Sequence, residues 1–497
     1  MCSVDPDELT EMTRATEGLD ISRGDVVCRK CGTSKAEVVL RVKDAYCRLC
    51  FLLYFVHKFR STIGKSKQIH AGDRVLVATS GGASSTALLH LLREGLNENS
   101  HKRLRFEPTF LYVDESCVSS CPRMGPEYVQ KICSEVNSLD FPIYVTSLQQ
   151  VMVPKPHPPV LFTKEWKDIN FPTTSGFEEN LRKLLCSCRS TTAQEDLLEQ
   201  LRREIIVHSA QTLGYQKVFL ADNSSKLSIR ILSQVAMGRG SQLSSQVNFK
   251  AFHHDIEVYR PMREILENEI LYYVDLHGLT VLQAPTFEPK GTSITSCAKE
   301  FVLGLQKDFP ATIPTVFRTG DKLVSTYPDC GKPSSTSLNG DPDSDFTVGI
   351  SSNRCALCGS HLDTGQGEAS ALHATLVSQK LSCHSSSHIL QHTETNDGTI
   401  VSHESYNMNG CATEKTSDSC DCDQSSGCCG GGKIGSTGNR KPEIIDKDVI
   451  ERYLCYGCRI ILREMEEVHH LPIKVQRAAA GLEQRRRMRE QIQDFLL

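Results

Sequence analysis

The chain has 497 residues, of which 39% are hydrophobic and 23% are charged, and its formal net charge is −4. This length exceeds one ordinary domain, and the composition excludes a collagen, a coiled coil and a fully disordered chain. The longest apolar run, Leu49 to Val56, is far shorter than the roughly 20 residues of a membrane helix. The N-terminus lacks the basic and apolar regions of a secretory signal. A large electropositive surface is not expected at this charge, although a local basic patch is compatible with it.

The cysteines indicate in which compartment the protein is expected. Eight of the 22 cysteines fall in Cys-x2-Cys pairs. The pairs are Cys28/Cys31, Cys47/Cys50, Cys355/Cys358 and Cys455/Cys458. A secreted protein with so many cysteines is expected to be small and to begin with a signal peptide. In a reducing compartment, thiolates at this spacing hold zinc more often than they form disulfides. The pattern therefore predicts a cytoplasmic protein that binds metal.

The first sixty residues combine an acidic tail with a cysteine-rich module. Residues 1–25 carry seven acidic side chains against two arginines, which is typical of a flexible tail. Residues 26–60 contain the first two cysteine pairs and then an aromatic run, Phe51 to Phe59, that favours a helix. We expect residues 26–60 to form an N-terminal zinc knuckle module.

Residues 61–325 alternate strand and helix patterns. Short apolar, β-branched runs predict strands at 74–78, 110–113, 143–145 and 217–221, and apolar spacing predicts helices at 86–96, 197–213 and 227–235. In the longest helix, one face gathers Leu197, Leu198, Leu201, Ile205 and His208. Strands that alternate with helices imply a parallel sheet covered on both faces, so we expect an α/β domain here.

The composition changes near Thr326. From Cys411 to Arg440 the apolar residues besides cysteine are Ala412 and Ile434, so this stretch cannot bury enough surface to offset its ordering entropy. It lies between the last two cysteine pairs. We therefore expect residues 326–460 to form a C-terminal zinc module with a long disordered insertion at about 360–440. Helical patterns at 444–467 and 475–497 predict a helical tail over 461–497.

The cysteine spacing suits two zinc ions. In Cys28-x2-Cys31-x15-Cys47-x2-Cys50, each knuckle places two sulfurs on one tight turn, and the 15 residues between them suffice for a return strand. Four protein ligands leave no position for a substrate, so the zinc would be structural. Because lengthening a loop between ligands costs little, we expect a second zinc across a 96-residue separation, at Cys355, Cys358, Cys455 and Cys458. The alternative is a set of unrelated buried thiols.

A glycine pair marks a predicted strand-to-helix junction, in the sequence Ser80-Gly81-Gly82-Ala83-Ser84-Ser85. Glycines there let backbone N–H groups turn inward, and the N-terminus of the following helix favours an anion. The pattern is not a Walker loop, because no Gly-Lys-Thr/Ser follows. An ordinary tight turn is the alternative reading.

This strand, turn and helix resemble the PP-loop of the ATP pyrophosphatases (adenine nucleotide alpha-hydrolase-like proteins), whose pattern is Ser-Gly-Gly-x-Asp-Ser. Further segments are similar to the tRNA-thiolation branch of that family: Cys186-Ser187-Cys188, Ala221-Asp222-Asn223-Ser224-Ser225-Lys226, Arg260-Pro261 with Glu269-Ile270 after it, and Cys455-Tyr456-Gly457-Cys458-Arg459. The resemblance runs roughly from Cys28 to Arg459, the insertion apart. It implies a PP-loop α/β core flanked by zinc modules, with a nucleotide-binding remnant at Ser80, Gly81, Gly82 and Ser85.

The chain departs from that branch at positions that carry its chemistry. The loop aspartate is Ser84 here, and the second acidic turn has become Ser225-Lys226, so the carboxylates expected beside Mg²⁺ and pyrophosphate are missing. A central cysteine is replaced by Tyr259, and Cys186 and Cys188 are spaced by one residue instead of two. We therefore expect no catalysis by this chain alone, and whether ATP binds to it is left open.

A basic patch follows the first zinc knuckle. No acidic residue occurs from Ala45 to Gly72, whereas basic side chains occur at Lys58, Arg60, Lys65 and Lys67. Such side chains can displace the counterions of RNA phosphates, so we expect RNA contact here. The alternative is an ordinary solvated face.

Together with the resemblance, these features imply a non-catalytic subunit of the complex that 2-thiolates the wobble uridine (mcm5s2U) of tRNAs for Lys, Glu and Gln. The resemblance implies three partners: a catalytic thiolase subunit in a heterodimer, tRNA, and a thiocarboxylated ubiquitin-related modifier that donates sulfur. Two alternatives remain. The chain is an ATP-using tRNA thiolase in its own right, or it is a zinc-bearing interaction scaffold without an RNA role.

Overall fold

The computed structural model describes residues 26–40, 44–99, 103–118, 126–163, 175–282, 291–323, 354–363 and 446–495. All of them belong to one unit, Met1–Ala374 with Ile445–Leu497. The acidic tail predicted over 1–25 and most of the insertion predicted at about 360–440 lie outside the described residues. Among these residues, no helix combines the length and the apolar character that crossing a membrane requires.

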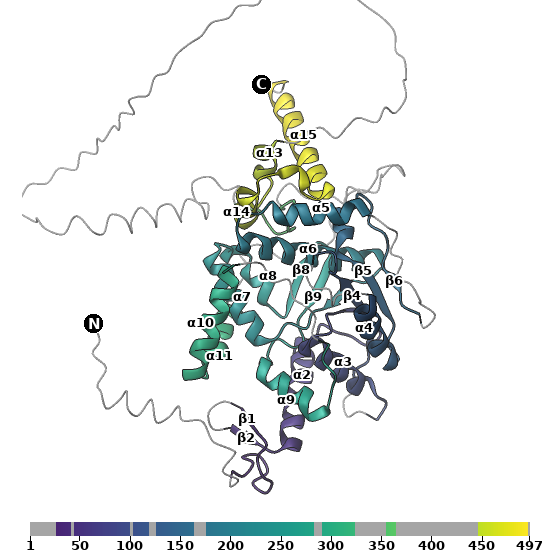
Figure 1. Ribbon diagram of the computed structural model, residues 1–497, viewed down its shortest axis with the longest axis vertical. Helices are drawn as coiled ribbons and strands as arrows, with labels where there is room; N and C mark the ends of the chain where they lie inside the picture. The colour runs from purple at the N-terminus through teal and green to yellow at the C-terminus, as the bar shows by residue number, and fades with distance from the viewer. Residues whose placement is uncertain are drawn as a thin grey trace, which may run out of the picture. The chain divides into compact units, whose positions relative to one another are not determined.

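A seven-stranded sheet forms the centre of the described chain (Figure 1). Its order is β6 (Val160–Leu161), β5 (Ile143–Ser147), β4 (Glu107–Asp114), β3 (Arg74–Thr79), β7 (Lys217–Phe219), β9 (Ile256–Tyr259) and β8 (Lys250–His253). The five inner strands pair in parallel, and each edge strand pairs antiparallel with its neighbour. The predicted α/β class with a parallel sheet is confirmed, and the predicted strands correspond to β3, β4, β5 and β7.

The chain reverses its direction of winding between β3 and β7. From β3 it proceeds through α3 (Ala83–Leu96) to β4 on one side, whereas β7 and then β9 extend the sheet on the other side. In open α/β sheets, ligands bind outside the carboxyl ends of the strands at such a switch point. The Ser-Gly-Gly turn follows β3, and the turn that begins at Ala221 follows β7, so both lie at this point.

Helices cover both faces of the sheet. One face packs Val75, Val77 and Phe110 against α2 (Arg48–Ser66), α3, α4 (Pro126–Ser138) and α9 (Glu267–His277). The other face packs Leu76, Leu111 and other strand residues against α6 (Thr191–Thr212). Alternate strand residues point to opposite faces, which explains why these strands are apolar throughout. The apolar face predicted for residues 197–213 is buried in α6.

The remaining helices surround this core. α7 (Ser224–Ala236), α8 (Leu243–Val247) and α11 (Thr312–Asp321) share a smaller apolar cluster, and α10 (Ile294–Asp308) packs on α7. The C-terminal part comprises α13 (Lys447–Arg452), α14 (Tyr456–Glu464) and α15 (Ile473–Phe495), and it shares one cluster with α6 and α5 (Ser175–Cys186). The single helix predicted at 444–467 is wrong, because the chain leaves the helix at Tyr453 so that Cys455 can enter the second cysteine group.

Candidate functional site

The Ser-Gly-Gly turn connects β3 to α3. Gly81 has a φ of 75°, and a Cβ there would lie 2.9 Å from Ile132 Cδ1, so the position needs glycine on two counts. Gly82 is the N-cap of α3, and its carbonyl accepts hydrogen bonds from the Thr86 N–H and the Ser85 hydroxyl. Ser80 is exposed and Ser85 is buried. The predicted nucleotide-binding remnant is thus an intact loop at the switch point, while its ligand stays a prediction.

The structure brings together the two turns that lack the expected acids. Asn223 Nδ2 donates to Ser84 Oγ at 3.0 Å, which joins the turn after β7 to the turn after β3. Ser225 is buried, and its Oγ accepts a hydrogen bond from the Glu267 N–H at 3.1 Å. Both serines that stand where the family resemblance puts carboxylates are therefore engaged inside the protein.

A buried charge network lies beside these turns. Asp222 pairs with Arg230 at 2.9 Å, with Arg260 at 3.3 Å and with Lys226 at 3.3 Å. Burial alone would raise the pKa of Asp222, but these three cations hold that pKa well below its usual range. Burial lowers the pKa of Arg260 to about 9 despite the Asp222 carboxylate. Asp222, the one carboxylate of this turn, is therefore engaged in ion pairs within the protein.

The central cysteines do not form a cluster. Cys186 is exposed at the end of α5. Cys188 is buried against the C-terminal part, and its backbone forms an isolated antiparallel β-bridge with Met465. Burial raises the pKa of Cys188 to about 12, which keeps it a neutral thiol. Tyr259 is buried in the cluster on the other side of the sheet and donates to Glu257 at 2.7 Å. Among the described residues, no potential metal-binding group includes either cysteine.

The first cysteine group lies at the N-terminal end of the described chain. Cys28, Cys31, Cys47 and Cys50 place their sulfurs within 4.8 Å of one another. The turn after Cys28 closes through a Gly32 N–H bond to the Cys28 carbonyl, and β1 (Val38–Leu40) with β2 (Asp44–Tyr46) forms the return hairpin. Cys47 is the N-cap of α2, so the second pair opens a helix.

The second cysteine group repeats this arrangement. Cys355, Cys358, Cys455 and Cys458 are all buried, and their sulfurs also lie within 4.8 Å of one another. Gly359 donates to the Cys355 carbonyl at 2.9 Å, and Cys455 is the N-cap of α14. The structure therefore closes the 96-residue separation and brings all eight predicted ligands into two groups of four.

Both groups fit a tetrahedral metal. A Zn–S bond of about 2.3 Å implies sulfurs about 3.8 Å apart around a tetrahedral centre. The Cys31 and Cys47 sulfurs are 3.9 Å apart, and those of Cys358 and Cys455 are 3.6 Å apart. A four-thiolate set suits zinc, and would hold it without an open position for a substrate. The identity of the metal stays a prediction.

A buried guanidinium supports the second group. Arg239 is 1% exposed, lies 3.8 Å from Cys458 Sγ and pairs with Asp196 at 2.5 Å. A Cβ on Gly457 would lie 2.4 Å from Arg239 Nε, so this arginine reaches the knuckle only because residue 457 is glycine. A divalent metal with four thiolates would carry net negative charge, and Arg239 would compensate part of it. Arg239 was not singled out from the sequence, because Arg239 and Cys458 are 219 residues apart.

The predicted RNA-binding residues divide into two kinds. Lys58 donates to Glu269 at 2.8 Å and to the Tyr54 hydroxyl at 3.0 Å, and its side chain is 21% exposed. Lys65 and Lys67 are exposed at the end of α2, and Arg60 is half-buried. Positions two apart on a helix point about 200° apart, so Lys58 and Arg60 do not share a face. Lys58 thus anchors α2 to α9, whichever role the other three have.

Comparison with known proteins gives consistent matches along the chain. The family described as "Cytoplasmic tRNA 2-thiolation protein 2" matches residues 293–460. Cytoplasmic tRNA 2-thiolation protein 2-A of Xenopus laevis is 30% identical over 549 residues, which cover 100% of this chain and 99% of that protein. The protein 2 of Xenopus tropicalis is 31% identical, with 100% and 98% covered. These relatives are named as cytoplasmic proteins, which confirms the location expected for this chain.

Among solved structures, the U34-tRNA thiolase NcsA from Methanococcus maripaludis, described with its [4Fe-4S] cluster, aligns with a TM-score of 0.45. Its sequence is 17% identical, and the alignment covers 63% of this chain and 93% of NcsA.

Proposed function

This chain belongs to the cytoplasmic tRNA 2-thiolation protein 2 family and serves in tRNA 2-thiolation; within that role, we propose that it is the non-catalytic subunit. Its partner is a catalytic thiolase subunit, with which it forms a heterodimer. The partner uses ATP to adenylate the C2 oxygen of the uracil, since a carbonyl oxygen leaves poorly until it is activated. The target is the wobble uridine of tRNAs for Lys, Glu and Gln, and a thiocarboxylated ubiquitin-related modifier supplies the sulfur.

The main observation behind this proposal is that Ser84 and Ser225, which stand where the family resemblance puts acidic residues, are hydrogen-bonded within the protein. Ser84 is hydrogen-bonded to Asn223, and Ser225 is hydrogen-bonded to the Glu267 backbone. Neither hydroxyl can supply the negative charge that holds Mg²⁺ beside a pyrophosphate. Asp222, the nearby carboxylate, is committed to Arg230 and Arg260. These contacts support a loop that is retained as structure.

The tRNA partner is assigned to the C-terminal end of α2. Lys65 and Lys67 are exposed there, and Arg60 lies between one and two turns earlier. Exposed cations displace counterions from a phosphate backbone, which makes binding salt-dependent. In this proposal Lys58 contributes indirectly, because its ion pair with Glu269 fixes α2 against α9.

The two cysteine groups complete the proposal as structural zinc sites. Sulfur distances of 3.9 Å and 3.6 Å support tetrahedral binding at both ends of the described chain. Each ion would fix a knuckle to a helix, α2 in the first case and α14 in the second. The first site would thereby hold the helix that carries Lys65 and Lys67.

Reconstitution tests the division of labour. The chain, its catalytic partner and both together are supplied with tRNA, ATP and a sulfur donor, and 2-thiouridine is measured by mass spectrometry of tRNA nucleosides. We expect thiolation only when both subunits are present. Thiolation by this chain by itself would support the ATP-using alternative, and full thiolation by the partner by itself would sink the proposal.

A restored acid provides a sharper version of this experiment. Ser84→Asp should not create activity in the isolated chain, because Ser225, Lys226 and Tyr259 remain. Groups that act as a unit are strongly non-additive, so repairing one member does little. Any ATP-dependent 2-thiouridine formed by the isolated variant would overturn the proposed loss of catalysis.

Two matched variants test the proposed contact with tRNA. Lys65→Ala with Lys67→Ala should weaken tRNA binding by the complex and reduce the slope of log affinity against log salt by about 2. Lys58→Ala should chiefly lower stability, because it leaves the buried Glu269 without its cation. Copurification with the partner should survive in both variants. A scaffold without an RNA role predicts an unchanged salt slope.

A further inference from the structure

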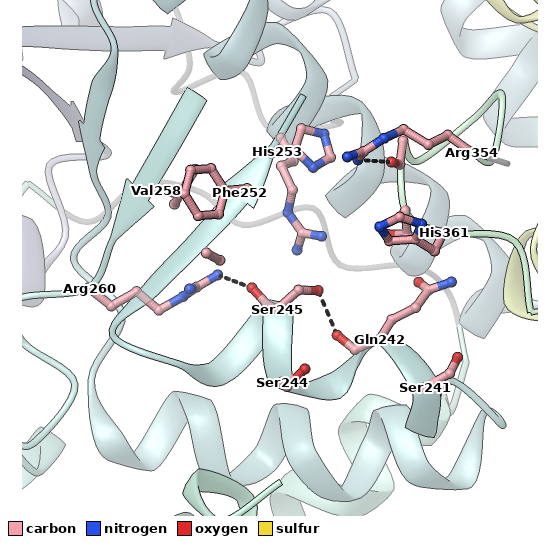
Figure 2. A pocket seen from close by; sticks show the side chains of 14 residues that line it. Ser241, Gln242, Ser244, Ser245, Phe252, His253, Val258, Arg260, Arg354 and His361 are labelled. Carbon is pink, nitrogen blue, oxygen red and sulfur yellow. Dashed lines mark hydrogen bonds between the residues drawn. The ribbon is translucent and has the colours of Figure 1, made fainter. Parts of the chain in front are cut away.

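A small polar pocket lies where α6, the β8–β9 hairpin, the segment 240–247 and the second cysteine knuckle meet (Figure 2). Its cavity volume is about 60 Å³. Three arginines line it from three parts of the chain: Arg203 from α6, Arg260 after β9, and Arg354 before Cys355. None of the lining residues is acidic. The pocket is separate from the Ser-Gly-Gly turn, so a ligand could bind in it whether or not this chain is the non-catalytic subunit.

The wall that contains Arg203 and Arg260 carries excess positive charge. Arg203 faces Glu199 at 3.5 Å, Glu199 also pairs with Arg230, and Arg230 pairs with Asp222, which holds Arg260. Glu199 and Asp222 are thus shared by these three guanidiniums, with Arg202 at 3.9 Å from Glu199 and Lys226 at 3.3 Å from Asp222 as further cations. Burial lowers the pKa of both Arg203 and Arg260, as expected where buried positive charge is incompletely compensated. An anion in the cavity would complete the balance.

A further cation comes from the opposite side. Figure 2 shows Arg260 and Arg354 on opposite sides of the pocket, with Ser245 and Gln242 along its lower side. Arg354 donates to the Gly359 carbonyl at 3.0 Å and forms no ion pair within the part of the chain that is described. Asp363, which does not line the pocket, accepts from the lining residue Ser241 at 2.9 Å and from the Tyr456 N–H. That acid is therefore already engaged outside the lining.

A buried amide points to a missing ligand. Gln242 is 5% exposed and lines the pocket, yet neither its Nε2 nor its Oε1 has a hydrogen-bond partner among the described residues. Buried polar groups in native proteins are nearly always paired, so an unpaired amide beside a cavity needs an explanation. The Nε2 group could donate to an oxygen atom held by the arginines.

We propose that this pocket binds a phosphate group, either as a free phosphate or as a phosphate ester. Guanidinium groups bind phosphate through paired charge-assisted hydrogen bonds, and the Gln242 amide and Ser244 add neutral polar groups to the lining. One ordered water needs about 10–15 Å³ of such space. A cavity of about 60 Å³ therefore has room for about as many atoms as a phosphate group contains. The ligand bridges the α/β core and the second cysteine knuckle.

Phosphate titration of the full chain tests this proposal. Isothermal titration and thermal unfolding are compared in sodium phosphate and in sodium chloride of equal ionic strength and pH. We expect saturable binding and a raised Tm with phosphate only. Arg354→Gln and Arg203→Gln should each weaken phosphate binding by about tenfold or more. The matched control is Arg202→Gln, which removes the same charge one residue away, from a side chain that does not line the pocket and that pairs with Glu115 at 2.5 Å and more distantly with Glu199 at 3.9 Å. No phosphate-specific binding, or equal affinity in all three variants, would overturn the proposal.

Gln242→Met keeps the test independent of folding defects. Methionine has nearly the shape of glutamine and no unpaired amide, so without phosphate the variant should be as stable as the parent chain or more stable. With phosphate it should gain less stability than the parent. A purely structural Gln242 predicts changes of the same size in both buffers, which would contradict its role as a ligand-binding group.

The source of the phosphate is decided by adding tRNA. If the ester is an RNA phosphate, Arg354→Gln should weaken tRNA binding, and phosphate should compete with tRNA in the parent chain. If the ligand is free phosphate or a mononucleotide, tRNA binding should be unchanged while phosphate binding is lost. Both outcomes keep the site and identify its source. If Arg354→Gln changed neither tRNA binding nor phosphate binding, the proposed site would be wrong.

Discussion

The two cysteine groups share a local design but differ in their surroundings. In each, the first pair closes a turn with glycine at the next position, Gly32 with a φ of 67° and Gly359 with a φ of 68°. In each, the second pair begins a helix. The first group has one exposed cysteine, Cys31, whereas all four cysteines of the second group are buried. The second also packs against α5 and α6 in one continuous apolar cluster.

The difference shows how one knuckle can serve two purposes. The first group forms a small cluster of its own, so a metal bound there would chiefly hold the hairpin of β1 and β2 to the start of α2. The second group contacts the core through Arg239 and Asp196, and it contributes a wall of the phosphate pocket. We therefore expect equivalent changes to cost more in the second group.

Removing a metal ligand should give the largest contrast. Cys458→Ser and Cys31→Ser should each lower bound zinc by about one equivalent, and such sites contribute on the order of 10 kcal/mol. Cys458→Ser should also lower the main calorimetric transition, because its cluster includes the core helices α5 and α6. Cys31→Ser should leave that transition largely in place. Elemental analysis and calorimetry check both.

The exposed thiol Cys297 on α10 supplies the control, because it belongs to no cysteine group. Cys297→Ser should change neither zinc content nor the calorimetric transition. Unchanged zinc in Cys31→Ser, or equal calorimetric effects of the two ligand variants, would contradict the contrast.

Charge removal should give a smaller contrast. Arg239→Met leaves Asp196 buried without its cation and should cost about 3–5 kcal/mol. Arg29→Met, in the first module, breaks an exposed pair with Asp44 and should cost less than about 1 kcal/mol. Urea unfolding monitored by circular dichroism measures the two values. Similar costs would mean that Arg239 is compensated from elsewhere.

Alanine at the two turn glycines should give the smallest contrast. An L-residue at this positive φ costs about 1–2 kcal/mol, and both positions incur that cost. A Cβ on Gly359 would also lie 3.0 Å from His254 Cε1, whereas no atom lies within 4 Å of a Cβ on Gly32. Gly359→Ala should therefore destabilise more than Gly32→Ala. Equal unfolding free energies would show that His254 moves without cost.

Local signals in the sequence were sufficient for the sheet centre and the cysteine pairs. The run Arg74–Ala78 and the apolar face of residues 197–213 depend on neighbours in the chain, and both correspond to observed elements. The β8–β9 hairpin was missed, because its turn is His254-Asp255, with a φ of 53° at His254, and lacks the Asn-Gly or Asp-Gly signal. A positive φ at a residue other than glycine is rarely visible in a pattern.

Contacts between residues far apart in the chain could not be predicted from the sequence. Nothing in a pattern connects Arg239 to Cys458, or Arg203 to Arg354, because each pair meets only once the sheet and the second knuckle are folded. The basic patch shows the converse: residues close in the sequence can have different surroundings. Lys58 was grouped with Lys65 by nearness in the chain, but its pairing with Glu269 on α9 is a tertiary contact.

The separation of the last two cysteine pairs sets an order for synthesis on the ribosome. The first group is complete once Cys50 has emerged, whereas the second must wait about 400 residues longer for Cys458. At about 5–20 residues per second, that interval is about 20–80 s. Cys355 and Cys358 emerge about 100 residues before Cys458, so for about 5–20 s they lack the two cysteines that complete their group, and Arg354 is not yet held in place. A metal at the second group would therefore be acquired only after Cys458 has been made, and it would mark chains whose synthesis has passed that residue.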